Sequence, residues 1–212
     1  MKLCTITGSR AEFFLLKNLI TKLTYDKKIK NDLLVTGSHN SAFFGNTIKD
    51  IRKSNFRIKA QIDLKIKKDK PSDISNYFSE GVKKFSYYLN KIKPDLILIL
   101  GDRYEIFSAA IAAHILRIPI AHIYGGETTQ GAIDEGIRHS ITKLSHIHFV
   151  STNKYFSRVK QLGENPKMIF NVGSLGVEAL KKNKTISKKN LEKKLGIKFR
   201  KKNVLITFHS ET

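Results

Sequence analysis

The chain alternates short apolar runs with longer stretches in which apolar residues recur every three or four positions. Short runs rich in Val, Ile and Leu are typical of strands, and the longer spacing is typical of helices that bury one face. We therefore predict strands at residues 2–7, 32–36, 61–66, 95–100, 119–123, 146–150, 168–172 and 203–207. Helices are predicted at residues 13–23, 74–92, 106–116, 133–144, 154–162, 177–181 and 191–195.

The order of these elements predicts the fold class. Strands and helices that alternate this regularly form βαβ units, which build a parallel sheet with helices on both faces. The run at 95–100, DLILIL, is apolar almost throughout, as expected of a strand that is buried on both faces. We predict an α/β protein with a Rossmann-like, doubly wound parallel sheet.

A change in composition divides the chain. Residues 1–180 contain the alternating elements and are expected to form one Rossmann-like domain. Residues 181–202 hold 11 basic residues and a single acid, Glu192, and are interpreted as a Lys-rich linker region. Residues 203–212 are predicted to begin a second domain with its first strand.

Composition favours a soluble cytoplasmic protein without a membrane partner. Hydrophobic residues make up 41% of the chain, enough for a packed core. No apolar run approaches the roughly 20 residues that span a bilayer. Met1-Lys2 enters an apolar strand at once, which leaves no room for a signal peptide. The single cysteine, Cys4, lies inside that strand and is expected to be a buried thiol.

The formal net charge of +21 suggests a nucleic-acid partner, but its distribution favours a solvated surface. Lys supplies 31 of the 39 basic residues, whereas recognition of bases and phosphates favours Arg. The chain also lacks a recognisable recognition helix or aromatic stacking motif. We therefore predict no nucleic-acid partner, although the positive field would attract polyphosphate ligands.

Polar side chains follow several predicted strands where each strand ends, and ligands of open parallel sheets bind at that edge. Asp102 follows the DLILIL strand, Glu127 follows the next strand, and Asp134 and Glu135 open the following helix. Each of these acids alone is also what a solvated turn or helix start would carry. Together they favour a functional site, because clustered carboxylates repel one another and lower stability.

Residues four apart on the helix at 133–144 share a face, which pairs Asp134 with Arg138 and Glu135 with His139. No metal site is predicted, since the histidines lack metal-ligand spacing with Cys4 or the carboxylates. The sequence also contains no Ser-His-Asp elbow, Walker loop or GxGxxG fingerprint.

Four segments carry a family resemblance: TGSRAE, LGDRYEIF, HIYGGETTQGAIDEGIRHSITKLSHIHFV and FHSET. Together they resemble the hydrolysing UDP-N-acetylglucosamine 2-epimerases of sialic and legionaminic acid biosynthesis, over residues 1–212. The resemblance implies the N-terminal half of a GT-B fold. It also implies conversion of UDP-N-acetylglucosamine, or a 4-acetamido-6-deoxy relative, and water to UDP and the free 2-epimer through a glycal. No cofactor is implied.

The resemblance also implies roles for individual side chains. Asp102, Glu127 and Asp134, with Glu135 adjacent, become the acid–base groups. Arg10 and His209 are expected near the diphosphate. The remaining substrate-binding candidates are Ser38, His39 and Asn46 in the sugar pocket, and Arg138 and His139 beside the acids.

The family's second domain is expected to supply most of the nucleotide contacts, so we expect little turnover from these 212 residues alone. Expected partners are the UDP-sugar, a second copy in a homodimer, and a separate C-terminal half. Three alternatives stay open: a non-hydrolysing 2-epimerase, a GT-B glycosyltransferase, and a non-catalytic half that pairs with a separately encoded partner.

Overall fold

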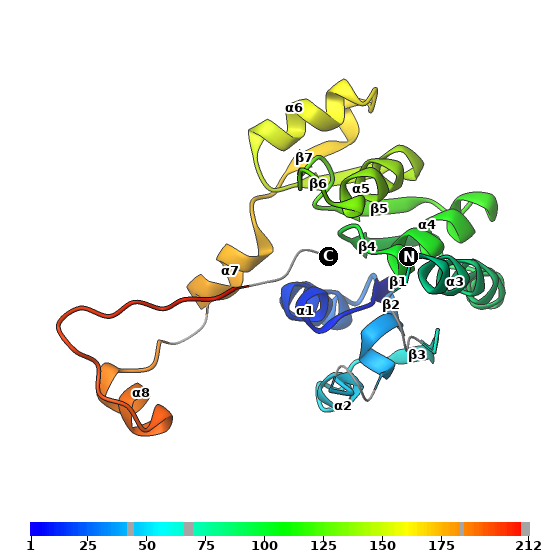
Figure 1. The fold of residues 1–212 in the computed structure, drawn as a ribbon. Coiled ribbons are helices and arrows are strands. Elements are labelled where there is room, and N and C mark those ends of the chain that lie inside the picture. Colours follow the sequence, from blue (N-terminus) through cyan, green and yellow to red (C-terminus); the bar gives the residue numbers. More distant parts are fainter. Residues whose placement is uncertain (42–44, 66–69, 183–184, 209–212) are drawn as a thin grey trace.

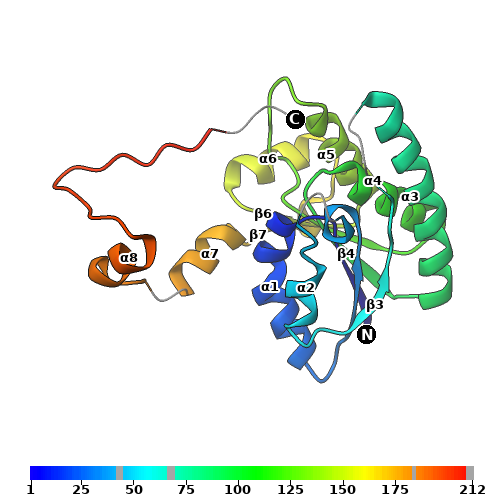
Figure 2. The ribbon, with the colours of Figure 1, turned by 60° about the horizontal axis from the view of Figure 1, so that its bottom comes forward.

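The computed structural model describes residues 1–41, 45–65, 70–182 and 185–208 (Figures 1 and 2). Its strands are β1 Lys2–Thr7, β2 Lys30–Val35, β3 Ile58–Gln61, β4 Leu96–Leu100, β5 Ile120–Ile123, β6 Ile147–Val150 and β7 Ile169–Asn171. Its α-helices are α1 Arg10–Tyr25, α2 Ile48–Arg52, α3 Pro71–Ile92, α4 Tyr104–Ile115, α5 Ile133–Leu144, α6 Asn153–Gln161, α7 Leu175–Lys182 and α8 Lys188–Leu195. Short 3₁₀ turns lie at Gly37–Asn40 and Pro166–Met168.

The described strands form one parallel sheet in the order β3-β2-β1-β4-β5-β6-β7. This confirms the predicted α/β, Rossmann-like class. The chain winds outward in one direction from β1 to β3 and in the other from β4 to β7. The winding therefore reverses between β1 and β4, and ligands of such sheets bind beside that point, outside the carboxyl ends of the strands.

Helices cover both faces of the sheet (Figure 1). Alternate residues of β4 show why, because successive side chains of a strand point to opposite faces. Ile97 and Ile99 pack in a core with α3, α4 and α5. Leu98 and Leu100 pack in a second core with α1 and α2. The strand needs apolar residues at every position, which is why DLILIL is an uninterrupted run. Cys4 of β1 is buried as expected.

The third predicted strand was placed too late. We expected residues 61–66, whereas β3 ends at Gln61. Ile62 and Leu64 are buried like strand residues, and the Ile62 amide still donates to the Val35 carbonyl at 2.8 Å. Their alternation therefore reflects burial beneath α3 rather than a continued strand ladder.

The strand predicted at 203–207 is wrong. The structure gives these residues no strand assignment, and none of the described strands pairs with them. Val204, Leu205, Ile206 and Phe208 are exposed at 85%, 94%, 83% and 91%. An apolar run becomes a strand only when a neighbouring strand accepts its hydrogen bonds. The prediction that these residues begin a second domain stays a prediction.

The last helices extend from the sheet over the side of α1. Lys22 of α1 and Glu178 of α7 lie 3.5 Å apart, and α8 stands farther out (Figure 1). Both helices were predicted from the sequence, at slightly shorter lengths. Among the described residues, no helix combines the length and apolar character that crossing a membrane requires.

Candidate active site

Two loops carry acids at the carboxyl edge of neighbouring strands. β4 and β5 pair directly, with Leu100 opposite Ile123. Asp102 follows β4, and Glu127 follows β5 after two glycines. α5 begins six residues after Glu127 and carries the other two predicted acids in its first turn. The expected meeting of these loops at one edge is confirmed.

Arg138 of α5 connects the two loops. Its side chain is buried, with the residue 6% exposed. One end of the guanidinium donates to the Glu127 carbonyl oxygen at 2.9 Å. The other end pairs with the Asp102 carboxylate and donates to the Thr129 hydroxyl at 3.2 Å. A planar guanidinium has donors at fixed angles, so these contacts hold both loops in one arrangement.

The Glu127 side chain is held by a third strand end. Its Oε1 accepts a hydrogen bond from the Ser151 hydroxyl at 2.8 Å, and Ser151 directly follows β6. The turn before it is fixed by Gly126, whose φ is +79°. A Cβ at Gly126 would lie 2.7 Å from the Tyr155 carbonyl oxygen, so α6 packs where only glycine fits.

The first turn of α5 presents the remaining predicted acids. Glu135 accepts a hydrogen bond from the Thr129 amide at 3.0 Å, and its other oxygen lies 3.7 Å from His139 Nε2. This confirms the predicted i, i+4 pair. Asp134 lies half-buried one residue earlier. The hydrogen bonds of Arg138 described above reach from this helix to the Asp102 and Glu127 loops.

The turn after β1 leads directly into helix α1. The Ser9 hydroxyl caps α1 by accepting from the Glu12 amide at 3.3 Å. Arg10 is exposed, and its guanidinium carbon lies 5.5 Å from the centre of the Phe14 ring. A cation at a helix start favours an anion, and the predicted place of Arg10 beside a diphosphate stays a prediction.

Of the predicted sugar-pocket residues, His39 has both ring nitrogens beside hydroxyl groups of the protein. It is fully buried, and its ring nitrogens lie 3.1 Å from the Thr7 hydroxyl and 2.7 Å from the Thr47 hydroxyl. Burial lowers its pKa to about 4. Through these two contacts His39 stabilises the turn after β2. Ser38 bonds to the Gly8 carbonyl at 3.2 Å, and Asn46 is half-buried with φ +49°.

His209 lies outside the described residues.

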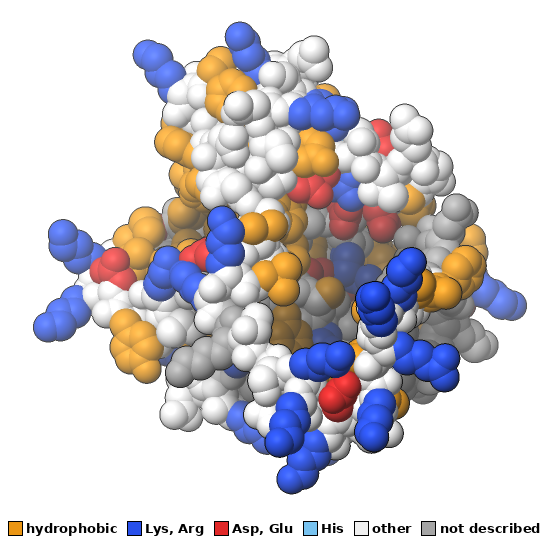
Figure 3. Space-filling model, turned by 90° about the vertical axis from the view of Figure 1, so that its left-hand side faces the viewer, with side chains coloured by type: hydrophobic (Ala, Val, Ile, Leu, Met, Phe, Trp, Pro, Cys, Tyr) orange, Lys and Arg blue, Asp and Glu red, His pale blue; other side chains and the backbone are white. Residues whose placement is uncertain are grey.

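Figure 3 looks at the molecule from the side of α7 and α8, and shows a hollow with acidic and basic side chains on one wall. Lys and Arg side chains crowd its rim in the same view. In the described part of the chain, no group of three or more His, Cys, Asp or Glu side chains could hold a metal ion.

The sequence reasoning missed a buried acidic pair beneath the turns after β1 and β2. Glu105 is fully buried, and its Oε1 accepts from Arg103 Nε at 2.7 Å. Glu12 is also buried, and its Oε2 accepts from the Gly8 amide at 2.7 Å. The second oxygen of each carboxyl is buried without a hydrogen-bond partner. Burial, followed by the charge of Glu105, raises the pKa of Glu12 to about 8.

A signal for this pair was present in the sequence. Ser9 and Glu12 match the S-x-x-E capping-box spacing, which places a glutamate at the start of α1. Glu105 sits in the same turn motif as Asp102. What the sequence does not reveal is that both side chains turn inward and approach each other, because α1 and α4 are far apart in the chain and begin after the paired strands β1 and β4.

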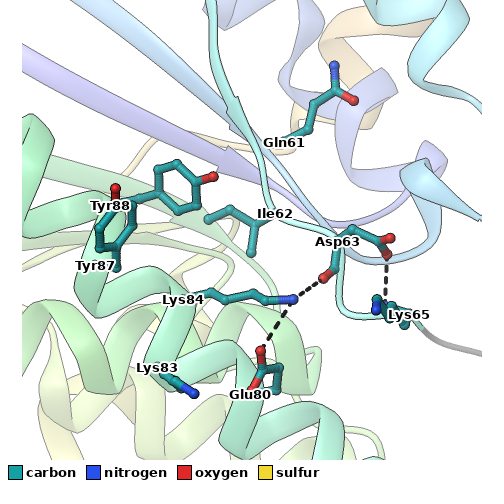
Figure 4. Close-up of a pocket in the computed structure, with 9 residues that line it drawn as sticks. All are labelled: Gln61, Ile62, Asp63, Lys65, Glu80, Lys83, Lys84, Tyr87 and Tyr88. Atoms are coloured by element: carbon teal, nitrogen blue, oxygen red, sulfur yellow. Dashed lines mark hydrogen bonds and ion pairs between the residues drawn. The ribbon is translucent and has the colours of Figure 1, made fainter.

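A separate pocket of about 470 Å³ lies between α3 and the segment after β3 (Figure 4). Lys84 crosses it, donating to the Asp63 carbonyl at 2.6 Å and lying 3.4 Å from Glu80. Tyr87 and Tyr88 form its other side. It contains none of the predicted site residues.

Comparison with known proteins places the chain among sugar-nucleotide enzymes. A family model described as UDP-N-acetylglucosamine 2-epimerase matches residues 21–212. The chain is 42% identical over its whole length to GDP/UDP-N,N'-diacetylbacillosamine 2-epimerase (hydrolyzing) of Campylobacter jejuni, covering 55% of that protein. It is 43% identical to polysialic acid biosynthesis protein P7 of Escherichia coli, covering 54%.

A solved structure has the same fold. The crystal structure of UDP-GlcNAc 2-epimerase from Neisseria meningitidis bound to UDP-GlcNAc matches 92% of this chain and 53% of its own, with a TM-score of 0.75 and 23% identity. The chain thus spans about half the length of the curated relatives it matches.

Proposed function

The chain belongs to the UDP-N-acetylglucosamine 2-epimerase family, and we propose that it carries the acid–base groups of a hydrolysing 2-epimerase. The proposed reaction converts a UDP-2-acetamido sugar and water to UDP and the free 2-epimeric sugar. The observation that carries the proposal is Arg138, which holds the Asp102 carboxylate and the Glu127 backbone at one edge of the sheet.

The proposed reaction needs more than one acid. The hydrogen on C2 of the sugar is not beside a carbonyl, so its removal is coupled to the departure of UDP from C1. A base takes the C2 proton, the C1–O bond breaks, and a glycal remains. Water then adds its hydroxyl to C1 while C2 takes a proton on the opposite face. The two proton transfers occur on opposite faces and require two groups.

The arrangement of side chains suits this sequence of steps. Asp102 and Glu127 stand on adjacent loops, each held by a partner that fixes its direction, Arg138 for one and Ser151 for the other. Asp134 adds a third carboxyl from α5. We propose these three as the proton-transfer groups. Arg10 and the first amides of α1 are proposed to stabilise the leaving diphosphate, since positive groups lower the barrier to its departure.

We propose a substrate with a 2-acetamido group, either UDP-N-acetylglucosamine or its 4-acetamido-6-deoxy relative. The relative from Campylobacter jejuni and one from Legionella pneumophila, 34% identical, are both named for N,N'-diacetylbacillosamine. The Escherichia coli relative is named for polysialic acid biosynthesis. These names support a place in the synthesis of nine-carbon acidic sugars.

Product analysis tests the proposal against its alternatives. Incubation of the chain, together with the second half of a relative, with each UDP-sugar in D₂O, followed by proton NMR, reports both the epimer and the UDP that is released. The proposal predicts UDP and a free sugar that carries deuterium at C2. A UDP-linked epimer would identify a non-hydrolysing enzyme. A chain that binds a separately produced second half but gives no product in that complex would identify a non-catalytic half.

A further inference from the structure

His122 lies at the centre of β5, fully buried directly beneath the loops of the candidate site. Its Nε2 lies 2.8 Å from the Gly101 carbonyl oxygen, and its Nδ1 lies 3.3 Å from the Thr142 hydroxyl. Resting on the proposed function, we infer that His122 is a positioning residue. It holds the Asp102 loop, the turn before Glu127 and helix α5 in the relative positions that proton transfer needs.

The hydrogen-bond partners decide where the proton sits. A backbone carbonyl oxygen only accepts, so His122 donates from Nε2 to Gly101. Nδ1 then carries no proton and lies 3.3 Å from the Thr142 hydroxyl, whose single hydrogen is donated to the Arg138 carbonyl oxygen. Burial lowers the pKa of His122 to about 4, and the positive charge of Arg138 acts in the same direction. The imidazole is therefore neutral and has a single tautomer at neutral pH. Such a ring can act as a fixed hydrogen-bond donor, but it does not exchange protons as an acid or base of the reaction would.

Three segments of the site meet at this ring. Gly101 directly precedes Asp102. Gly125 begins the turn to Glu127, and a Cβ there would lie 3.0 Å from Thr142 Oγ1 and 3.2 Å from His122 Nδ1. The turn before Glu127 is thus packed directly on the pair of side chains.

The third segment is α5. The Thr142 hydroxyl packs against His122 Nδ1 and donates to the Arg138 carbonyl oxygen at 3.0 Å, one helical turn earlier. Arg138 in turn pairs with Asp102, which closes a ring of contacts around His122. A shift of the Gly101 carbonyl would move Asp102 against Arg138. Displacements of about 1 Å in a catalytic arrangement cost on the order of 100-fold in rate.

The neighbouring strand offers a matched control. His148 of β6 is the register partner of His122 and is just as buried. Its Nε2 lies 3.2 Å from Glu164, which follows α6 and also pairs with Lys143 near the end of α5. Replacing it perturbs the same part of the sheet but removes no contact to the Asp102 loop, to the turn before Glu127 or to Arg138.

NMR of this chain tests the inference without catalysis. Long-range ¹H–¹⁵N spectra are expected to show His122 as the Nε2–H tautomer, without titration between about pH 5.5 and 8. The Arg138 guanidinium protons report the arrangement of the loops. His122→Asn cannot reach Gly101 and is expected to speed their exchange by at least about tenfold. His122→Gln keeps a donor near the Nε2 position and is expected to stay within about threefold of the wild type.

The control decides between positioning and general stability. His148→Asn is expected to leave Arg138 exchange unchanged. Equal acceleration by both asparagine variants would overturn the inference, as would an Nδ1–H tautomer in the wild type. If His122→Asn does not fold, the tautomer and the His122→Gln exchange rate still decide.

Steady-state kinetics give a second test, carried out on the chain alone or on the chain joined to a relative's second half, whichever of the two proteins releases UDP. His122→Asn is expected to lower kcat by about 100-fold with KM within about threefold, and His122→Gln to recover most of the loss. A raised KM with unchanged kcat would contradict positioning of the acids. Failure of the proposed function appears differently, as a wild type that releases no UDP while the NMR results are as expected.

Discussion

Arg138 is the side chain on which the candidate site depends most. It contacts Asp102, the Glu127 carbonyl and Thr129 from within the protein. A buried guanidinium with several partners is costly to replace, because each partner then loses a charged donor in a medium of low polarity. The Asp-Glu-Gly-Ile-Arg-His run identified this residue in the sequence. The sequence predicted that Arg138 lies beside the acids, but not its contacts with Asp102, the Glu127 carbonyl and Thr129, since these residues lie on two other loops.

Arg138→Lys is expected to reduce kcat/KM by about 100-fold, because a single ammonium cannot reach both loops at once. UDP release rates would measure the change. Arg57→Lys is the matched control, since Arg57 pairs with buried Asp32 at 2.9 Å on β2, away from the site. A fully active Arg138→Lys variant would show that Arg138 does not hold the acids.

Glu12 provides a prediction on pH. Its pKa of about 8 when folded is well above its ordinary value of 4.5, chiefly through burial. Above pH 4.5 the unfolded chain releases this proton while the folded chain keeps it, so stability falls as pH rises and levels off beyond about pH 8. Glu12→Gln removes this loss. Relative to wild type, the variant is expected to gain on the order of a few kcal/mol between about pH 5 and 9.

Urea unfolding of both proteins across that range would measure the difference. Glu178→Gln is the control, because Glu178 lies on exposed α7 and its pKa is lowered through its pair with Lys182. A Glu12→Gln variant that follows the wild-type pH dependence would show that Glu12 is ionised in the folded protein.

At the scale of elements, the sequence predicted what depends on local pattern and missed what depends on pairing. The continuous apolar run of β4 and the helical period of α5 placed both elements and the acids beside them. The run at 203–207 has the same apolar character, yet no described strand pairs with it. Glu12 and Glu105 were missed because the sequence does not show that both side chains turn inward after the paired strands β1 and β4.

The turn after β2 is tightly built. Gly37 has φ +58°, and a Cβ there would lie 2.5 Å from both the Gly8 carbonyl oxygen and Glu105. Gly37→Ala is expected to destabilise the protein by about 3 kcal/mol or more, because backbone strain and a steric clash add. Gly131→Ala is the control, since its φ is +84° but nothing lies within 4 Å of the added atom.

Gly131→Ala is expected to cost only about 1 kcal/mol, the strain alone. Chemical denaturation of the two variants measures both values. Equal losses at the two positions would show that Glu105 and the Gly8 loop move aside, and that the buried acidic pair is not rigidly packed.

At the scale of the whole molecule, the net positive charge and the exposed apolar side chains lead to separate predictions. The net charge of +21 comes mainly from lysines, with a dense group on α8 and its flanks. We expect weak binding to duplex DNA at about 50 mM salt that disappears by about 200 mM, as counterion release requires. Fluorescence anisotropy across salt concentrations measures this. Tight binding that persists at high salt would contradict the prediction that the protein has no nucleic-acid partner.

The chain spans about half the length of its curated relatives, and the apolar side chains at 204–206 and 208 are exposed. We therefore expect the 212 residues alone to bind a UDP-sugar poorly and to release little UDP. Joining the chain to the second half of a relative is expected to restore turnover, if the acids proposed above are those of the reaction.

The most direct test is therefore UDP release with proton NMR of the sugar in D₂O, on that fusion and on its Asp102→Asn and Glu127→Gln variants. We predict UDP and a free 2-epimer with deuterium at C2 from the parent fusion, and a loss of at least about 100-fold in each variant. A folded fusion that is inert with both UDP-sugars, or variants that keep the parent rate, would contradict the assignment of the acid–base groups to this edge of the sheet.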